Sequence, residues 1–167
     1  MRTIQIFLLL FFSIFLTGFS KPTKITLYDK IRKLELNDDV YCHAQNLYFE
    51  TSGEPYKGKI AVIFVVSNRV KDQRWPNDVC DVIWQKKWKT NKKKFVSQFS
   101  WTTDGKSDTP RNKKEWYQSL LIAQAWKDKK LKNTIGNATH YHSIAVKPWW
   151  RKKFRRVASI GRHIFYK

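Results

Sequence analysis

A continuous apolar run at residues 60–66 (IAVIFVV) limits the possible folds more than any other feature of the sequence. A segment without a polar face belongs in the interior of a domain. Its β-branched residues would also suit a buried strand, and periodicity alone does not decide between the two. The apolar character extends over residues 56–70, however, and ends in the polar segment 67–69. That length favours a helix, so we predict a buried helix over residues 56–70.

Cap and turn residues mark the other elements. The acidic cluster at residues 37–39 predicts a helix start, and Gly53 is placed to end that helix. The basic lead-in at residues 21–36 is interpreted as a strand or a docking arm. The remaining predicted elements are a helix over 40–52, a turn at 75–78, a short helix over 79–84, a helix over 110–130 and a strand over 157–166 broken at Gly161. With no internal repeat and no linker, the pattern indicates one domain.

The composition restricts the class of protein and its partners. The chain has 167 residues, of which 42% are hydrophobic, with 6 glycines and 2 cysteines. These values exclude intrinsic disorder, collagen-like sequence and a disulfide-dense scaffold. Lys and Arg number 33 against 13 Asp and Glu, which gives a net charge of +20. Such a charge favours an anionic partner, which the composition leaves open as nucleic acid, lipid headgroups or an acidic wall polymer.

The amino-terminal segment narrows that choice. A short basic start is followed by an apolar stretch over residues 4–19 and a small-x-small site at residues 18–20. This pattern predicts a signal peptide over residues 1–20, with an uncleaved membrane anchor as the alternative. Either route exports the protein to the periplasm, the cell wall or the outside, where nucleic acid is not an expected partner. We therefore expect an anionic wall or membrane surface, and a monomer.

A lysine-rich segment at residues 86–94 contains six lysines around Trp88. Runs of like charge are usually solvated, so a solvated loop is the predicted state. A specific binding patch is the alternative.

The chain contains only four glutamates, and two of them, Glu50 and Glu54, lie close together. Cleavage of a glycosidic bond needs a carboxyl that is still protonated near neutral pH, and apolar surroundings raise the pKa of such a group. Tyr48 and Phe49 flank Glu50 and favour that role. The negative charge of Glu54 would raise the pKa of Glu50 further if the helix continued, although Gly53 is placed to break it. Two surface carboxylates at a helix end are the alternative interpretation.

Other polar and aromatic segments suit a sugar-binding cleft. In the segment His140-Tyr141-His142, residues two apart share a side only in a strand. Without a third ligand the segment predicts a hydrogen-bonding cleft wall in preference to a zinc site, so no metal is expected. Residues 98–101 (QFSW) and 148–150 (PWW) supply groups for sugar faces, although tryptophan is more often buried.

Cys42 and Cys80 are an even pair in an exported chain, which predicts one disulfide. Such a bond would contribute about 3–4 kcal/mol by closing a long loop. Two free buried thiols are the alternative.

Seven sequence blocks follow one another in the order of a known family. They are residues 46–55 (NLYFETSGEP), 58–62 with 67–70 (SNRV), 75–83 (WPNDVCDVI), 98–101 with Asp104-Gly105, 138–142 (ATHYH), 148–149 and 160–166 (IGRHIFY). Together they resemble the SleB-type cell-wall hydrolases, the spore-cortex-lytic group. The resemblance covers residues 40–167.

The resemblance implies an α+β fold, mostly helical and lysozyme-like, with a small antiparallel sheet. It implies a peptidoglycan-cleaving domain over residues 40–167, after a lead-in at 21–39, that acts on the β-1,4 bond between N-acetylmuramic acid and N-acetylglucosamine without a cofactor. The catalytic glutamate of the family carries over to Glu50, as general acid and base of a lytic transglycosylase. The expected residues of the substrate cleft are Glu54, Gln98, Ser100, Trp101, His140 and Tyr141.

Departures from the family pattern leave alternatives open. Many relatives have Ala-Arg where this chain has Thr51-Ser52, so a possible substrate-binding arginine is absent. Cysteines that flank the QFSW block in some relatives are replaced by Ser97 and Thr103. A hydrolysing muramidase, which needs a second carboxylate, and a non-catalytic basic wall-binding protein are the rival predictions.

Overall fold

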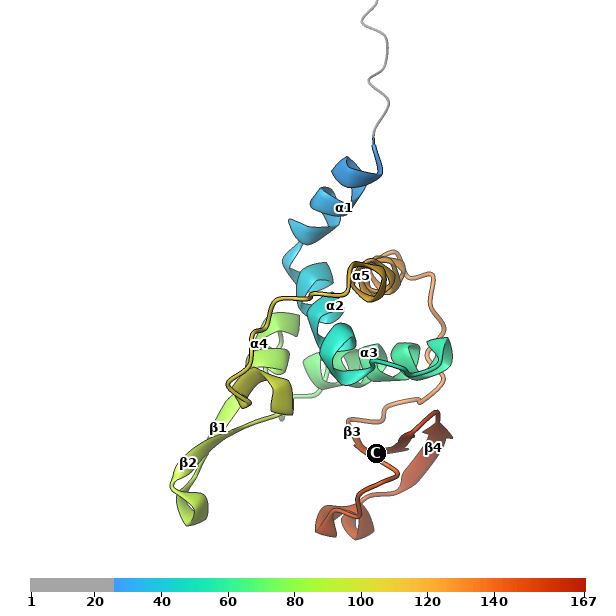
Figure 1. Ribbon diagram of the computed structural model, residues 1–167. Coiled ribbons are helices and arrows are strands. Elements are labelled where there is room, and N and C mark those ends of the chain that lie inside the picture. Colours follow the sequence, from blue (N-terminus) through green and yellow to red (C-terminus); the bar gives the residue numbers. More distant parts are fainter. Residues whose placement is uncertain (1–25) are drawn as a thin grey trace, which may run out of the picture.

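The computed structural model describes residues 26–167 (Figure 1). The predicted signal peptide lies outside the described residues. The helices are α1 (Leu27–Glu35), α2 (Asp38–Glu50), α3 (Tyr56–Val70), α4 (Val79–Trp84) and α5 (Lys113–Lys127), with 3-10 turns η1 (Thr90–Lys92), η2 (Ser100–Thr103) and η3 (Trp149–Lys153). The strands are β1 (Lys86–Lys89), β2 (Lys94–Ser97), β3 (His140–Ser143), β4 (Arg156–Ile160) and β5 (His163–Tyr166). Across residues 26–167, none of the helices has the length and apolarity needed to cross a bilayer.

The apolar run forms α3, which confirms the predicted helix over residues 56–70. Ala61, Val62, Val65 and Val66 have no exposed surface. Ala61, Val62 and Val65 belong to one apolar cluster, to which α2, α5 and β5 contribute Leu47, Leu120 and Phe165. The helical layer therefore encloses α3, as a helix without a polar face requires.

Helix α2 leads to the position of Glu50. It starts where the Asn37 side chain accepts a hydrogen bond from the amide of Val40 at 3.2 Å, and it ends at Glu50. Gly53 has φ +72°, a left-handed conformation that glycine adopts without strain and that turns the chain toward α3.

The predicted disulfide is confirmed. Cys42 of α2 is bonded to Cys80 of α4 across a sequence separation of 38 residues. Next to it a second apolar cluster forms around Val66, Ile83 and Phe99. The bond therefore ties the helix that carries Glu50 to the short helix before the lysine-rich segment.

A three-stranded antiparallel sheet, in the order β3-β5-β4, lies below the helices in Figure 1. Tyr141 of β3 is paired with Phe165 of β5. Strands β4 and β5 confirm the predicted strand broken at Gly161. Helices with small antiparallel sheets confirm the α+β fold class.

The lysine-rich segment is a hairpin, so the predicted loop is wrong, whereas the predicted solvent exposure of its lysines is confirmed for β1. Strand β1 pairs with β2 in the register Trp88↔Phe95, and η1 forms the turn. All four residues of β1 are exposed. Because no hydrophobic alternation against a core exists here, the sequence pattern gave no strand signal.

Two other predictions are corrected, the start of the helix after residue 110 and the structure of the lead-in. Helix α5 begins at Lys113 instead of Pro110, because the amides of Arg111 and Asn112 donate to the Tyr48 hydroxyl at 3.1 and 3.0 Å and lie before the helix. The lead-in forms α1 instead of a strand. A capping box between Thr26 and Asp29 starts this helix.

Candidate active site

Glu50 is the last residue of α2, and its carboxyl group is largely surrounded by other side chains. Burial disfavours the anion and raises the pKa of Glu50 above its ordinary value. The negative carboxyl-terminal end of the α2 helix dipole also disfavours the anion. The last turn of α2 contains no basic residue that would offset this effect. This carboxyl is therefore suited to hold a proton.

Tyr141 from β3 holds one oxygen of that carboxyl group. Its hydroxyl donates a hydrogen bond to Oε2 of Glu50 at 2.8 Å. Burial, followed by the negative charge of Glu50, raises the pKa of Tyr141 well above its ordinary value, so the phenol remains a donor. This bond lowers the pKa of Glu50 and so limits the effect of burial.

Arg69 of α3 is a buried cation near the same pair. Its Nε donates to the carbonyl oxygen of Thr139 at 2.8 Å, and its guanidinium lies 4.4 Å from the ring centroid of Trp75. Nη1 is buried without a hydrogen-bond partner. Burial lowers the pKa of Arg69 to about 10, while the electrostatic interactions with Tyr141 and Glu50 oppose that shift. Arg69 therefore remains charged at neutral pH and favours the Glu50 anion.

A pocket of about 320 Å³ opens beside the Glu50 carboxyl group. Its floor is Trp101, which is 5% exposed, stacks on Phe49 at 4.8 Å and donates from its indole nitrogen to Asn46 at 3.1 Å. Asp104 and Asp108 line the same pocket as Glu50. The complete lining is Phe49, Glu50, Ser100, Trp101, Asp104, Lys106, Ser107 and Asp108.

The structure brings together three of the residues assigned to the cleft. Ser100 and Trp101 line the pocket with Glu50, and Tyr141 contacts the carboxyl group directly. Gln98 instead lines a neighbouring pocket of about 290 Å³, which also includes Ser100.

His140 is engaged elsewhere in the sheet. Its ring stacks on Phe154 at 4.1 Å, and its Nδ1 lies 2.9 Å from the Thr139 hydroxyl. Burial, followed by the positive charges of Arg69 and Arg74, lowers the pKa of His140 to about 4. His140 is thus a neutral aromatic group at neutral pH.

Glu54 does not lie beside Glu50. It is 6% exposed, and its Oε1 and Oε2 accept hydrogen bonds from Nε and the amide of Arg162 at 2.7 and 3.0 Å. Burial acts to raise the pKa of Glu54, but the hydrogen bonds from Arg162 and the charge of His163, 3.7 Å away, outweigh it, so the pKa lies below its ordinary value. The prediction that Glu54 raises the pKa of Glu50 is therefore wrong, because the chain turns at Gly53 and Arg162 holds the second carboxylate.

Sequence reasoning assigned no role to Arg69, and it could not place the candidate second carboxylates Asp104 and Asp108, which line the Glu50 pocket. Arg69 stands in the last turn of α3, after the apolar run, and its place in the family block at residues 67–70 (SNRV) is the signal that marked it. Within residues 26–167, no group of three side chains suited to a metal ion occurs.

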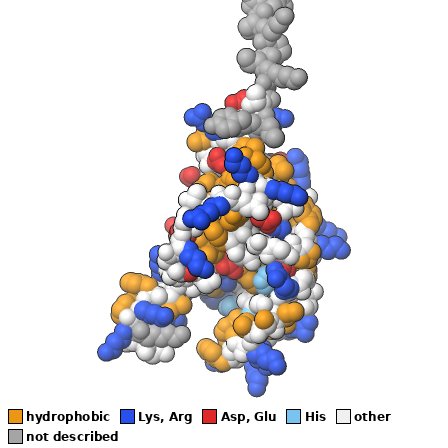
Figure 2. All heavy atoms as spheres, viewed as in Figure 1, with side chains coloured by type: hydrophobic (Ala, Val, Ile, Leu, Met, Phe, Trp, Pro, Cys, Tyr) orange, Lys and Arg blue, Asp and Glu red, His pale blue; other side chains and the backbone are white. Residues whose placement is uncertain are grey.

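The space around the site is visible on the surface. Figure 2 shows two projections with a hollow between them, and side chains of Asp or Glu and His at the inner end of the hollow. In Figure 1 the projections correspond to the β1–β2 hairpin and to the part of the chain that contains β3 and β4.

Comparisons with known proteins agree with this architecture. The model of the family described as "Cell Wall Hydrolase" matches residues 53–166, and Glu50 lies just before this range. The chain is 29% identical to a spore cortex-lytic enzyme of Bacillus cereus over 133 residues, which cover 78% of this chain and 44% of that enzyme. The spore cortex-lytic enzyme of Bacillus subtilis is 28% identical over 132 residues, 77% of this chain and 37% of the relative. The chain thus spans less than half the length of these relatives.

Two solved structures are similar over most of the described chain. One is the catalytic domain of the germination-specific lytic transglycosylase SleB from Bacillus anthracis, with a TM-score of 0.60 and 28% identity. The structural match covers 78% of this chain and 95% of that domain. The other is the catalytic domain of the Bacillus cereus SleB protein, with a TM-score of 0.57, 28% identity and coverage of 78% and 90%.

Proposed function

Since the chain belongs to the cell wall hydrolase family, we propose that it is an exported enzyme that cleaves the glycan strands of peptidoglycan with Glu50 as its general acid. The observation that carries this proposal is the buried Glu50 carboxyl group, with a raised pKa, at the edge of a polar and aromatic pocket. A carboxyl of this kind is what protonation of a glycosidic oxygen requires.

The proposed reaction is that of a lytic transglycosylase at the N-acetylmuramic acid–β-1,4–N-acetylglucosamine bond. Tyr141 holds Oε2 of Glu50, which leaves Oε1 to carry the proton. The proton passes to the glycosidic oxygen as the bond from that oxygen to C1 of the muramoyl sugar breaks, and the positive charge of Arg69 favours the carboxylate that remains. The muramoyl C6 hydroxyl then attacks C1, its proton returns to Glu50, and a 1,6-anhydro ring closes. The SleB domain from Bacillus anthracis, described as a lytic transglycosylase, supports this route.

Hydrolysis is a second candidate, because Asp104 and Asp108 line the pocket of Glu50. A carboxylate across the sugar from the acid is what an inverting or retaining hydrolase needs. Mass spectrometry of the products separates the two routes: anhydromuramoyl ends indicate a transglycosylase, and reducing ends indicate a hydrolase. Loss of cleavage in D104N or D108N together with reducing ends would establish the second route.

The proposal is tested with Glu50→Gln on purified peptidoglycan. We expect kcat to fall about 10³-fold, within the range that general acid catalysis contributes. Glu54→Gln is the matched control, because it makes the same substitution four positions later. Its folded fraction should still cleave peptidoglycan at a measurable rate. Equal cleavage by wild type and Glu50→Gln would remove Glu50 from the mechanism. Absence of cleavage in the folded wild type would instead favour the basic wall-binding protein.

The net charge of +20 supports association with an anionic wall or membrane surface. Such binding should weaken as salt is added, because ions screen exposed charges. Association that stays constant between low and high salt would contradict this part of the proposal.

A further inference from the structure

The β1–β2 hairpin presents an aromatic pair that the chemistry at Glu50 does not use. Trp88 and Phe95 are register partners with ring centroids 5.1 Å apart, and they are 54% and 60% exposed. Large apolar side chains exposed together on a soluble protein usually mark a binding surface. Residues 82–103 contain six lysines, at positions 86, 87, 89, 92, 93 and 94, and no Asp or Glu.

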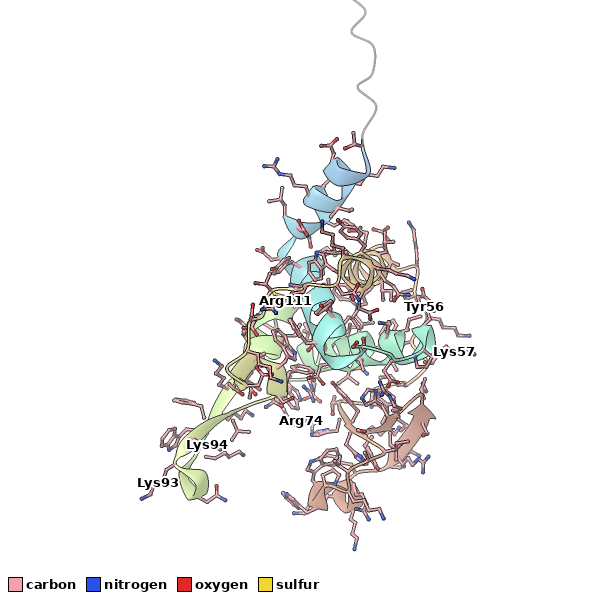
Figure 3. All side chains as sticks on the ribbon, viewed as in Figure 1. Tyr56, Lys57, Arg74, Lys93, Lys94 and Arg111 are labelled. Carbon is pink, nitrogen blue, oxygen red and sulfur yellow. A yellow bond between two sulfur atoms is a disulfide. The ribbon has the colours of Figure 1, made fainter. Side chains whose placement is uncertain are left out.

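The aromatic pair lies on one defined face of the hairpin. Side chains alternate along a strand, so Trp88 shares its face with Lys86, while Lys87 points to the opposite face. Lys87 reaches to 5.5 Å from the ring centroid of Trp75, so this opposite face is the one that contacts Trp75, and the aromatic face is the other one. Figure 3 shows Lys93 and Lys94 at the free end of the hairpin.

The aromatic face continues toward Glu50. Phe95 shares its face with Ser97, whose hydroxyl lies 2.9 Å from the hydroxyl of Thr103 in η2. Phe95, Ser97 and Thr103 all line the pocket of about 290 Å³, which also includes Ser100. Ser100 lines the Glu50 pocket as well. Ser100 is thus a common wall of the two pockets, so the hairpin face and the Glu50 pocket lie on either side of one residue.

We propose that this face, formed by Trp88 and Phe95 with Lys86 beside them, and the adjoining pocket that Lys94 lines, is an extended subsite for the peptidoglycan strand beyond the bond that is cut. The proposal rests on the proposed function and deepens it. Sugar rings present C–H groups that pack on aromatic faces, and the peptide stems of peptidoglycan carry carboxylates that lysines attract. A bilayer is the less favoured partner, because Phe95 also lines a pocket whose wall Ser100 is shared with the Glu50 pocket.

The first test measures binding to purified, teichoic-acid-free peptidoglycan in the full chain carrying Glu50→Gln, so that binding is compared without turnover. The test variant combines Trp88→Thr with Phe95→Thr, which removes both rings and keeps residues that favour strands. We expect its dissociation constant to rise about tenfold, the scale of a binding hot spot. Leu121→Thr is the matched control, because Leu121 is 63% exposed on α5. The control should bind as the parent does.

The second test uses the same hairpin change in the active chain. On long glycan strands we expect KM to rise about tenfold, and we expect a smaller change on a short glycan that does not reach the hairpin. Unchanged binding and unchanged KM on long strands would overturn the proposal. An equal loss in Leu121→Thr would also overturn it. The same variants are compared for binding to vesicles of phosphatidylglycerol. If the hairpin variant lost binding only to these vesicles and not to peptidoglycan, the face would belong to a membrane contact. Full cleavage by Glu50→Gln would refute the proposed role of Glu50, and the KM comparison in the active chain would then decide on the subsite alone.

Discussion

Two regions of the molecule place a glutamate in the interior with opposite results. At the end of α2, Glu50 has one neutral donor, Tyr141, and burial dominates, so its pKa rises. In the turn before α3, Glu54 is also buried, but Arg162 donates two hydrogen bonds to it, and its pKa falls. Burial alone therefore does not set the protonation state of a carboxyl group. The partners that the fold brings to it decide whether it stores a proton or holds the structure together.

The two regions are also connected. His163 lies 3.7 Å from the Glu54 carboxylate and contacts the ring of Tyr141 edge-on, at 5.1 Å between centroids. The Glu54–Arg162 contact thus supports the sheet that holds Tyr141 against Glu50. We infer that Glu54 has a positioning role, which the following predictions separate from the role of Glu50.

The largest effect on stability is expected for Gly161→Ala. Gly161 has φ +57°, and an added Cβ would clash with Oε2 of Glu54 and approach Pro55 Cδ to 2.9 Å. The left-handed conformation and the overpacking together should cost about 3 kcal/mol of unfolding free energy. Gly105→Ala is the control, because Gly105 has φ +75° and no atom within 4 Å of the added Cβ. Urea denaturation checks both, and equal losses would show that the Glu54 region is not tightly packed.

Glu54→Gln is expected to lower the free energy of unfolding by about 2 kcal/mol at neutral pH, because it weakens charge-assisted hydrogen bonds. The folded-state pKa of Glu54 lies below its ordinary value of 4.5. Its contribution is therefore present above pH 4.5 and is lost as the pH falls through the lowered value. Denaturation at a series of pH values should show the variant approaching the wild type in acid. A difference that does not change with pH would contradict the assignment.

Tyr141→Phe should affect the pH dependence of cleavage more than stability. The phenol stabilises the Glu50 anion, so its removal raises the pKa of Glu50 further and moves the alkaline limb of the pH–rate profile to higher pH. The cost in stability should be about 1 kcal/mol, that of one hydrogen bond. Tyr48→Phe is the matched control, because the Tyr48 hydroxyl accepts from Arg111 and Asn112. A limb that moves equally in both variants, or only in the control, would argue against the Tyr141 contact.

The smallest effect is expected for the stability of Glu50→Gln. Because the folded-state pKa of Glu50 is raised above 4.5, the wild type loses stability as the pH rises from 4.5 through that value. Removal of the ionisable group should therefore stabilise the protein at neutral pH by about 0.5–1 kcal/mol, as is common at functional sites. Thermal unfolding at pH 7 and in acid checks this sign. A variant that is less stable than the wild type at pH 7 would show that the ionised Glu50 carboxylate stabilises the fold, as that of Glu54 does, and would contradict this prediction.

The sequence predicted the parts of the molecule that depend on neighbours along the chain. The helix over residues 56–70 followed from its apolar length, and the aromatic neighbours of Glu50 pointed to a protonated carboxyl. The contact between Glu54 and Arg162 joins residues 108 positions apart, and no local pattern indicates it. The place of Arg69 likewise depends on Thr139, 70 positions away. The hairpin was not predicted, because its lysine-rich strands show no hydrophobic alternation against a core.

The most direct measurement is a titration of the individual glutamate carboxyl groups by carbon-13 NMR. The chain has four glutamates, Glu35, Glu50, Glu54 and Glu115, so single Gln variants assign every signal. We predict that Glu50 titrates above pH 4.5 and Glu54 below it. Titration of Glu50 at or below the midpoint of Glu54 would contradict the account.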